Sequence, residues 1–300
     1  MTNNHIAKQI CLMAAMLSLS LMGCNENAIE QQTAPERTEQ QAARWAQTTI
    51  KHGTRLSYTA NKIMLAGTPT DGAKDAPDAA LHYKEVQEVS IFIDTEGRNY
   101  EEFSRVVDHS GRRDEYDPTK VAERVVRNGQ ITAFNNGGKA LYALHPEDNG
   151  AKGSEENYGM LLMPCHERSQ LILKQLSDVS KQGGRLLNEA GAKSAGSLSV
   201  EQLSESVLKL TQPLTDTRSG QEQRFIAVSY INTKYGVPVL SETYSEAGEL
   251  LSRLTQLYKL VDSVPVLAYE ESIFYTPDQN GQPIENKTIT HYENIEIQKF

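Results

Sequence analysis

Apolar and polar residues alternate along most of the chain after Gly53, and this alternation predicts strands. Leu56 and Tyr58 alternate with polar neighbours, and the segment 82–94 ends in an apolar run that contains Ile91 and Ile93. Near the C-terminus, residues 293–298 read ENIEIQ. Such a pattern is typical of an antiparallel sheet with one covered face and one wet face.

Turn residues divide the predicted strands into hairpins. Asn128-Gly129 and the segment 135–138 are each flanked by Val, Ile, Phe, Leu or Tyr, which is the strongest local hairpin signal. Further turn signals separate at least four strands in the final third of the chain: 245–248, 262–265 and 280–281. Four segments without a pattern are predicted loops: 67–80, 146–157, 184–198 and 214–222.

The hydrophobic period changes to about 3.6 residues in three segments, and each is a predicted helix. Residues 38–53 start with polar residues behind Thr38 and stop at a glycine. Residues 166–183 place Leu171, Ile172 and their helical neighbours on one face. A third predicted helix is capped by Ser199 and closed by a proline at 213. A helix, hairpins, a helical insert and more hairpins together indicate an α+β fold.

The first residues have the pattern of an export signal. An uncharged stretch follows Lys8 and is shorter than the roughly 20 apolar residues that a membrane span needs. The sequence Leu21-Met22-Gly23-Cys24 resembles the lipobox of bacterial lipoprotein precursors. The resemblance implies that Leu21 and Gly23 are recognised during processing. It also implies that Cys24 carries diacylglycerol and that its new amino group takes a further acyl chain such as palmitate. An ordinary secretory peptide with an incidental cysteine is the alternative.

An acylated N-terminus would make a bacterial membrane the protein's first partner. Each buried methylene contributes about 0.8 kcal/mol, so two or three chains anchor a protein stably. Asn25 favours the periplasmic face of the outer membrane in an organism with two membranes, because Asp at that place retains enteric lipoproteins on the inner membrane. Residues 25–37 are polar and are interpreted as a flexible tether.

Composition narrows the remaining partners. The net charge is −9, and its mixed distribution argues against nucleic acid, which needs clustered Lys and Arg. Cys11 leaves with the signal peptide and Cys24 carries lipid, so Cys165 stands alone in the folded part. An internal disulfide is therefore not expected.

Candidate catalytic patterns lack their required companions. Ser206 and Lys209 fit S-x-x-K, but S-D-N and K-T-G are absent, and we place both residues on the wet side of the third helix. Cys165-His166-Glu167 is interpreted as a helix start, because adjacent side chains point apart. The seven His residues show no metal-ligand spacing. We therefore predict a protein that is not an enzyme and that uses no cofactor and no metal.

Three segments resemble LolA/LolB-like proteins, the outer-membrane lipoprotein-sorting group. They are INTKYGVPVLSETYSEAGELLSRLTQLYKLV at 231–261, RVVRNGQITAFNNGGKALYALHP at 124–146 and ITHYENIEIQKF at 289–300. The resemblance covers about residues 40–300 and implies an incomplete β-barrel, a large curved antiparallel sheet with helices over its concave side. In that group the apolar interior takes acyl chains. No individual binding residue transfers.

These patterns divide the chain into a signal peptide at 1–23, the lipidated Cys24 with its tether up to 37, and a single domain at 38–300. That domain holds a helical and loop insert at about 166–222. We expect a membrane-anchored envelope lipoprotein that binds acyl chains or other hydrophobic ligands. The alternative is a structural or signalling lipoprotein that contacts another protein without a lipid ligand. An enzyme with an unrecognised site is a third possibility.

Apolar positions on the predicted strands are the candidates for lining a ligand cavity. Ordinary core packing is the competing interpretation for each of them. The candidates are Leu56, Tyr58, Ile63, Ile91, Ile93, Ile131, Leu141, Phe225 and Ile226.

Replacing Cys24 tests the lipobox. We expect Cys24→Ala to abolish incorporation of labelled palmitate and to leave the signal peptide uncut, because the thiol is the acceptor of the lipid. Cys165→Ala is the matched control and should label like the parent. Labelled Cys24→Ala protein would contradict the prediction.

Overall fold

The computed structural model describes ten stretches of the chain, and those stretches carry the whole account below. They are residues 48–69, 81–111, 121–127, 130–135, 138–144, 158–181, 192–194, 198–216, 223–277 and 283–300. The lipobox, the tether and most of the first predicted helix lie outside them. Among the described residues, no helix is both long and apolar enough to cross a membrane.

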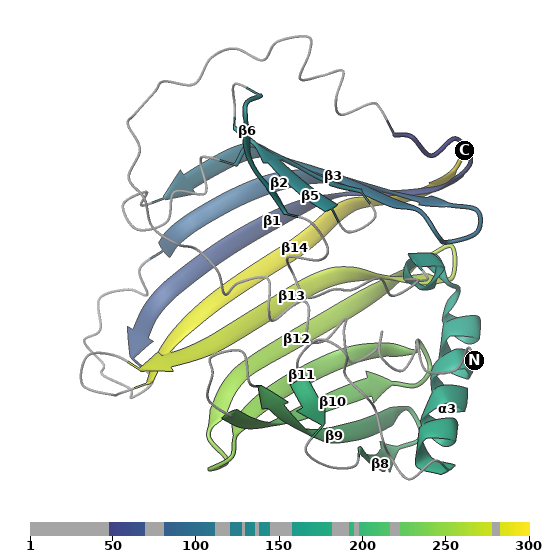
Figure 1. Cartoon of the computed structure of the whole chain (residues 1–300), viewed down its shortest axis with the longest axis vertical. Helices are drawn as coiled ribbons and strands as arrows, with labels where there is room; N and C mark the ends of the chain where they lie inside the picture. Colours follow the sequence, from purple (N-terminus) through teal and green to yellow (C-terminus); the bar gives the residue numbers. More distant parts are fainter. Residues whose placement is uncertain are drawn as a thin grey trace.

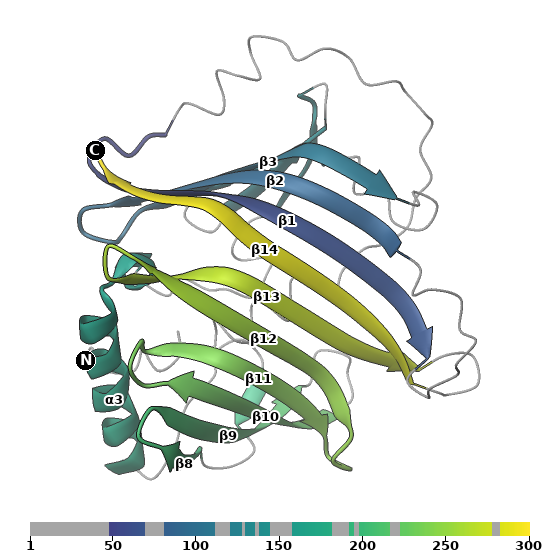
Figure 2. The ribbon, with the colours of Figure 1, turned by 180° about the vertical axis from the view of Figure 1, so that it is seen from behind.

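The described strands form one 14-stranded antiparallel sheet (Figures 1 and 2). The first half contains β1 (Gly53–Pro69), β2 (Leu81–Asp94), β3 (Tyr100–Gly111), β4 (Glu123–Arg127), β5 (Gln130–Phe134) and β6 (Ala140–Leu144). The second half contains β7 (Ala192–Ser194), β8 (Ser199–Ser204), β9 (Val207–Asp216), β10 (Gln223–Asn232), β11 (Val237–Ser245), β12 (Leu250–Val261), β13 (Val264–Pro277) and β14 (Pro283–Lys299). A 3-10 helix, η2 (Tyr158–Leu162), and an α-helix, α3 (Cys165–Lys181), lie between the halves in sequence.

The strand order shows two runs of hairpins joined at one place. It is β6-β5-β4-β3-β2-β1-β14-β13-β12-β11-β10-β9-β7, and β8 also pairs with β9. Strand β1 pairs with β14 from Thr54↔Lys299 to Pro69↔Ile284. At the end of this pair, Gly53 and Phe300 exchange two backbone hydrogen bonds of 3.1 Å each. The sheet is curved and stays open, as expected for an incomplete barrel.

Several local predictions are confirmed. The Asn128-Gly129 signal separates β4 from β5, with Arg127 opposite Gln130. The second hairpin signal separates β5 from β6, where Gly138 has a φ of 73° and its N–H donates to the Asn135 carbonyl at 2.8 Å. Helix α3 begins at Cys165, in agreement with the helix start predicted at Cys165-His166-Glu167.

The third predicted helix is wrong, because the residues after Ser199 form β8, a turn at 205–206 and then β9. Leu208 and Leu210 are buried on one face of β9, so the buried apolar residues repeat every two positions, as in a strand. Ser206 lies in the turn and Lys209 on a strand, which removes the S-x-x-K residues from any helix.

The last residues of the first predicted helix, 48–52, are not helical, and β1 starts at Gly53; residues 38–47 of that prediction lie outside the described part of the chain. Three of the predicted loop segments contain strand residues. Strand β1 runs to Pro69, β9 runs to Asp216, and β7 falls within 184–198.

The register separates an inner face of the sheet from an outer face. Directly paired residues point to the same side, and neighbours along a strand point to opposite sides. One row of the inner face runs through Leu210, Ser229, Ser241, Leu254 and Ser272. The next row includes Gln256, Glu270, Thr290 and Lys62.

Two separate hydrophobic clusters lie on the inner face. The first cluster joins Ile172 of α3 to three strand residues, Leu208, Leu210 and Ile231. The second cluster is formed by Val89, Ile91 and Ile93 of β2, against which Leu161 and Leu162 of η2 pack. Both helical segments therefore contact the inner face, at different strands.

Helix α3 is fixed to the ends of the strands (Figure 1). The Cys165 N–H donates to the Ser263 carbonyl at 2.8 Å, and the Ser169 hydroxyl donates to the Thr233 carbonyl. Gly236, with a φ of 64°, lies against the same helix. The expected cover of several helices over the concave side is not seen in the described part of the chain, where α3 borders the sheet instead.

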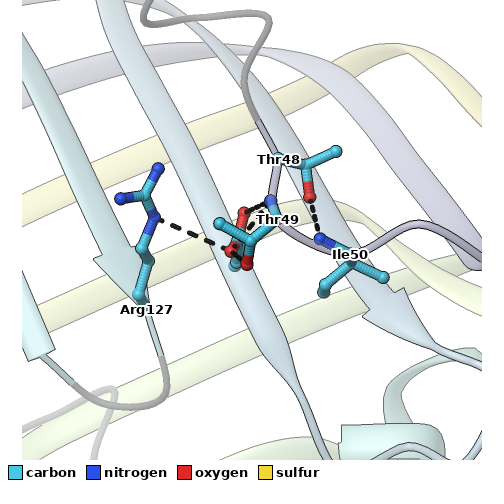
Figure 3. Close-up of polar contacts among 5 residues, drawn as sticks. Thr48, Thr49, Ile50 and Arg127 are labelled. Carbon is cyan, nitrogen blue, oxygen red and sulfur yellow. Dashed lines mark hydrogen bonds and ion pairs between the residues drawn. The ribbon is translucent and has the colours of Figure 1, made fainter.

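The segment 48–50 crosses the outer face (Figure 3). The N–H of Thr49 donates to both carboxylate oxygens of Glu101, at 3.2 and 3.1 Å, and its hydroxyl donates to the same group. Arg127 approaches this carboxylate with its Nε at 3.7 Å. Glu101 is 3% exposed, so the start of the folded chain is fastened at a buried carboxylate.

Gly236 tests the docking of α3. A Cβ at this position would lie 2.7 Å from the Ser169 nitrogen. We expect Gly236→Ala to lower the free energy of unfolding by about 3 kcal/mol or more, because displacement of α3 adds to the roughly 1–2 kcal/mol of left-handed strain. Urea unfolding followed by circular dichroism measures the loss.

Gly248→Ala is the matched control, since Gly248 has a φ of 87° but no atom within 4 Å of its added Cβ. It should cost only the strain, about 1–2 kcal/mol. Equal losses in the two variants would contradict the proposed role of Gly236 in seating α3.

Candidate functional site

Four tyrosines form a band across the inner face, and two of them, Tyr58 and Tyr100, pack against the second hydrophobic cluster. Tyr58 lies on β1, Tyr100 on β3, Tyr258 on β12 and Tyr292 on β14. The rings of Tyr58 and Tyr292 meet edge to face across the central pair, with centroids 5.4 Å apart. This tyrosine band therefore extends over strands from both halves of the sheet.

Burial raises the pKa of all four tyrosine hydroxyls. The charge of Glu102 raises the pKa of Tyr58 and Tyr100 further, and Tyr100 donates its hydroxyl to the Glu102 carboxylate. Each hydroxyl thus keeps its proton at neutral pH. The band is a set of neutral hydrogen-bond donors in a poorly hydrated place.

A hydrogen-bonded chain continues the band along β12 and β13. Tyr258 donates to Gln256 Oε1 at 3.2 Å, and Gln256 Nε2 donates to Glu270 Oε2 at 3.0 Å. Burial raises the pKa of Glu270, while the hydrogen bond from Gln256 and the charge of Lys62 lower it. The balance is a carboxylate that holds its proton more tightly than it would in water.

Arg168 brings a positive charge to the other end of this chain. It lies in the first turn of α3 and is 6% exposed. Burial lowers its pKa, and the group whose charge opposes this effect is Tyr258. Among the described residues, no side chain forms an ion pair or hydrogen bond with its guanidinium group.

Arg124 of β4 adds a second, half-buried cation near Tyr58 and Tyr100, whose pKa values its charge lowers. Its Nε is buried without a hydrogen-bond partner in the described structure. The inner face therefore carries two arginines, Arg124 and Arg168, among tyrosine hydroxyls and carboxylates. Such a set suits a polar or anionic group of a ligand.

Among the described residues, no group of three or more His, Cys, Asp or Glu side chains lies close enough together to bind a metal ion. His166 and Glu167, beside Cys165, are both exposed and lie 3.6 Å apart at the start of α3. The inner-face groups described above are suited to binding and orienting a ligand.

The structure divides the predicted cavity residues between the two faces. Six lie on the inner face by register: Leu56, Tyr58, Ile91, Ile93, Ile131 and Phe225. Three lie on the outer face: Ile63, Leu141 and Ile226. Whether the inner six line a ligand cavity stays a prediction. Leu21, Gly23 and Cys24 lie outside the described residues.

Sequence reasoning missed most of the polar groups at this site. Tyr100 and Glu102 share a face in any strand, and Gln256 and Tyr258 follow the same rule, whereas Glu270 joins them only through the pairing of β12 with β13. That spacing was a usable local signal. Their meeting with groups of β1 depends on the β1–β14 register, which no local pattern reveals.

Comparison with known proteins gave matches only among solved structures. No protein-family profile and no curated protein matches the chain. A DUF1329-family protein from Desulfovibrio piger is 8% identical, with 85% of this chain and 89% of that chain covered and a TM-score of 0.43. A putative outer membrane lipoprotein-sorting protein domain from Vibrio parahaemolyticus is 14% identical, with 82% and 86% covered and a TM-score of 0.42. A LolA-superfamily protein from Nitrosomonas europaea is 9% identical, with 82% and 87% covered and a TM-score of 0.36.

Two adjacent glutamates on opposite faces test the electrostatics of the inner face. Glu270 has a raised pKa, so its folded form binds a proton more tightly than its unfolded form, and stability falls as pH rises through the raised pKa. The parent should therefore lose stability as pH rises, and Glu270→Gln should not. We expect the melting temperature of Glu270→Gln minus that of the parent to increase between about pH 4 and about pH 7.5.

Glu271→Gln is the matched control on the outer face. Burial there is outweighed by hydrogen bonds from Lys287 and Tyr269, so the pKa of Glu271 is lowered and its contribution to stability is present above the unfolded pKa. This variant should lose melting temperature relative to the parent over the same pH range. Parallel pH profiles for the two variants would refute the assignment.

Proposed function

We propose that this protein is an exported, lipid-anchored protein of the bacterial cell envelope that binds acyl chains of an amphipathic ligand on the inner face of its sheet. It acts without catalysis and without a cofactor. Its folded part is the ligand-binding domain, and the lipid on Cys24 attaches it to the membrane.

One observation carries this proposal. The inner face does not close over a continuous core, because its two hydrophobic clusters are separate and only η2 and α3 pack there among the described residues. Inner-face apolar side chains outside the two clusters remain half-buried, among them Met64, Leu214, Phe225 and Phe274. Apolar surface left over on a curved sheet is available to an apolar ligand.

The tyrosine band supports an amphipathic ligand over a purely apolar one. Buried hydroxyls with raised pKa values donate hydrogen bonds and gain little from contact with hydrocarbon alone. A ligand with a polar group and an acyl chain satisfies both parts of the face.

Contact with another protein is the second candidate function. Strand β8 lies at the sheet edge, and all six of its residues are exposed. Val200 and Leu203 are 38% and 48% exposed. An edge strand with free backbone groups can accept a strand from a partner chain.

Binding is tested first by native mass spectrometry. A form that starts at residue 25 keeps every described residue and can be purified from a bacterial periplasm without detergent. We expect a bound mass in the range of a phospholipid or lipopeptide, lost on organic extraction. A clean unliganded mass, unchanged after incubation with phospholipid vesicles, would move the function to protein contact.

Phe225 and Ile226 offer a matched pair for the same measurement, because both are half-buried on β10 but face opposite sides. We expect Phe225→Glu to weaken lipid binding about tenfold or more, since it places a charge among apolar contacts. Ile226→Glu should bind within about twofold of the parent. Equal effects of the two substitutions would contradict binding on the inner face.

A further inference from the structure

We propose that the Arg168 guanidinium, beside Tyr258 on the inner face, is the site that holds the anionic head group of the bound ligand. The chemistry is that of a carboxylate or a phosphate carried by an acyl chain. This inference rests on the proposed function and specifies which ligands the inner face prefers.

The first argument is the isolation of the Arg168 charge. A guanidinium group stays protonated in proteins even when burial lowers its pKa. Burying such a charge without a partner is costly, and buried arginines are normally paired with carboxylates. Arg168 is 6% exposed, and no described residue pairs with its guanidinium, whose nitrogens keep some contact with solvent because none is among the fully buried atoms without a partner. An anion supplied by a ligand would complete the site.

The nearest part of the polar network does not neutralise this cation. The cation that lowers the pKa of Glu270 is Lys62, and Glu270 is held by Gln256. Arg168 acts instead on the Tyr258 hydroxyl, whose pKa it lowers against the effect of burial. Tyr258 gives its hydrogen bond to Gln256. The charge of Glu270 also acts on Tyr258, whose pKa it raises. The donors still open to a ligand here are therefore those of the Arg168 guanidinium.

The second argument is the position of Arg168 relative to the first hydrophobic cluster. Ile172 follows one helical turn after Arg168, so the two side chains project from the same face of α3. Ile172 is buried in the first cluster with Leu208, Leu210 and Ile231. An anion at Arg168 thus lies between an apolar surface and the polar chain of Tyr258 and Gln256. This is the layout that an anionic amphiphile needs.

The third argument is that packing and hydrogen bonds hold the first turn of α3, and with it Arg168, in a fixed position. A Cβ at Gly236 would lie 3.0 Å from the Arg168 Cγ and 2.7 Å from the Ser169 nitrogen. The glycine lets the arginine stem lie directly against the β10–β11 turn. The hydrogen bonds of Cys165 to Ser263 and of Ser169 to Thr233 hold the same turn of helix. A rigid mounting lowers the entropy lost when the guanidinium binds two oxygens of one anion.

Two spin-labelled probes of equal chain length test the proposal by electron paramagnetic resonance. They are 16-doxyl stearate, which has a carboxylate, and its methyl ester, which does not. The protein is the form that starts at residue 25, and each variant is first checked for folding by its melting curve. We expect the parent to bind the carboxylate probe about tenfold or more tighter than the ester, as a charge-assisted bidentate contact requires.

Arg168→Gln should bind both probes with the affinity that the parent has for the ester. Arg168→Lys keeps the charge but loses the fork, so it should retain part of the preference. Arg105→Gln is the control, because Arg105 lies on the outer face beside Glu88 and should leave the preference unchanged.

The outcomes separate this inference from the proposed function. Equal binding of both probes by the parent would overturn the head-group site while leaving acyl binding intact. Failure of both probes to bind would overturn the proposed function itself. Inorganic phosphate is the third arm. If phosphate alone stabilises the parent but not Arg168→Gln, and stearate does not, the ligand is a free anion and the acyl assignment is overturned.

A melting measurement without ligand gives an independent readout. Removing a buried, unpaired charge while keeping its volume stabilises a fold, so we expect Arg168→Met to melt at a higher temperature than the unliganded parent. The same variant should lose the preference for the carboxylate probe. A lower melting temperature together with a retained preference would show that Arg168 is a structural residue and would overturn the site.

Discussion

The pairing of β1 with β14 is the contact on which the rest of the structure depends. Each half of the sheet is built from neighbouring hairpins, but these two strands lie at opposite ends of the folded chain. Their register brings Tyr58 beside Tyr292 and sets Lys62 on the row that contains Glu270. The inner-face site therefore exists only once the two halves have joined. Local hairpins can form without this pairing, whereas the tyrosine band cannot.

Two buried charges, one on each side of the sheet, differ in their partners. On the outer face, Glu242 is 8% exposed and accepts hydrogen bonds from Arg253 at 3.0 Å and Tyr244 at 2.8 Å. On the inner face, Arg168 is as deeply buried without such a partner. A closed pair belongs to a surface that is finished on folding. An unpaired buried charge lowers the stability of the unliganded fold, and an anionic ligand that binds it would remove this cost.

Local chemistry made much of the fold predictable. Asn128-Gly129 and the junction at Cys165 carry their signals within a few residues, and both were placed correctly. The segment after Ser199 was misassigned because its polar start also suits a helix cap, while its turn contains neither glycine nor proline. Ile63 and Ile226 faced outward because apolar character does not say which side of a strand is covered. Arg168 escaped notice because its isolation is a property of the assembled fold.

The fastening of Thr49 to Glu101 gives the protein a mechanical property. Any pull arriving through the preceding residues reaches these hydrogen bonds before it reaches β1, which begins at Gly53. Strand β1 is then gripped on both sides, by β2 and by β14. A force along this strand loads two ladders of hydrogen bonds in parallel, the strongest way to resist shear. A protein suspended from a membrane by its N-terminal residues would thus transmit tension into the middle of its sheet without unzipping an edge.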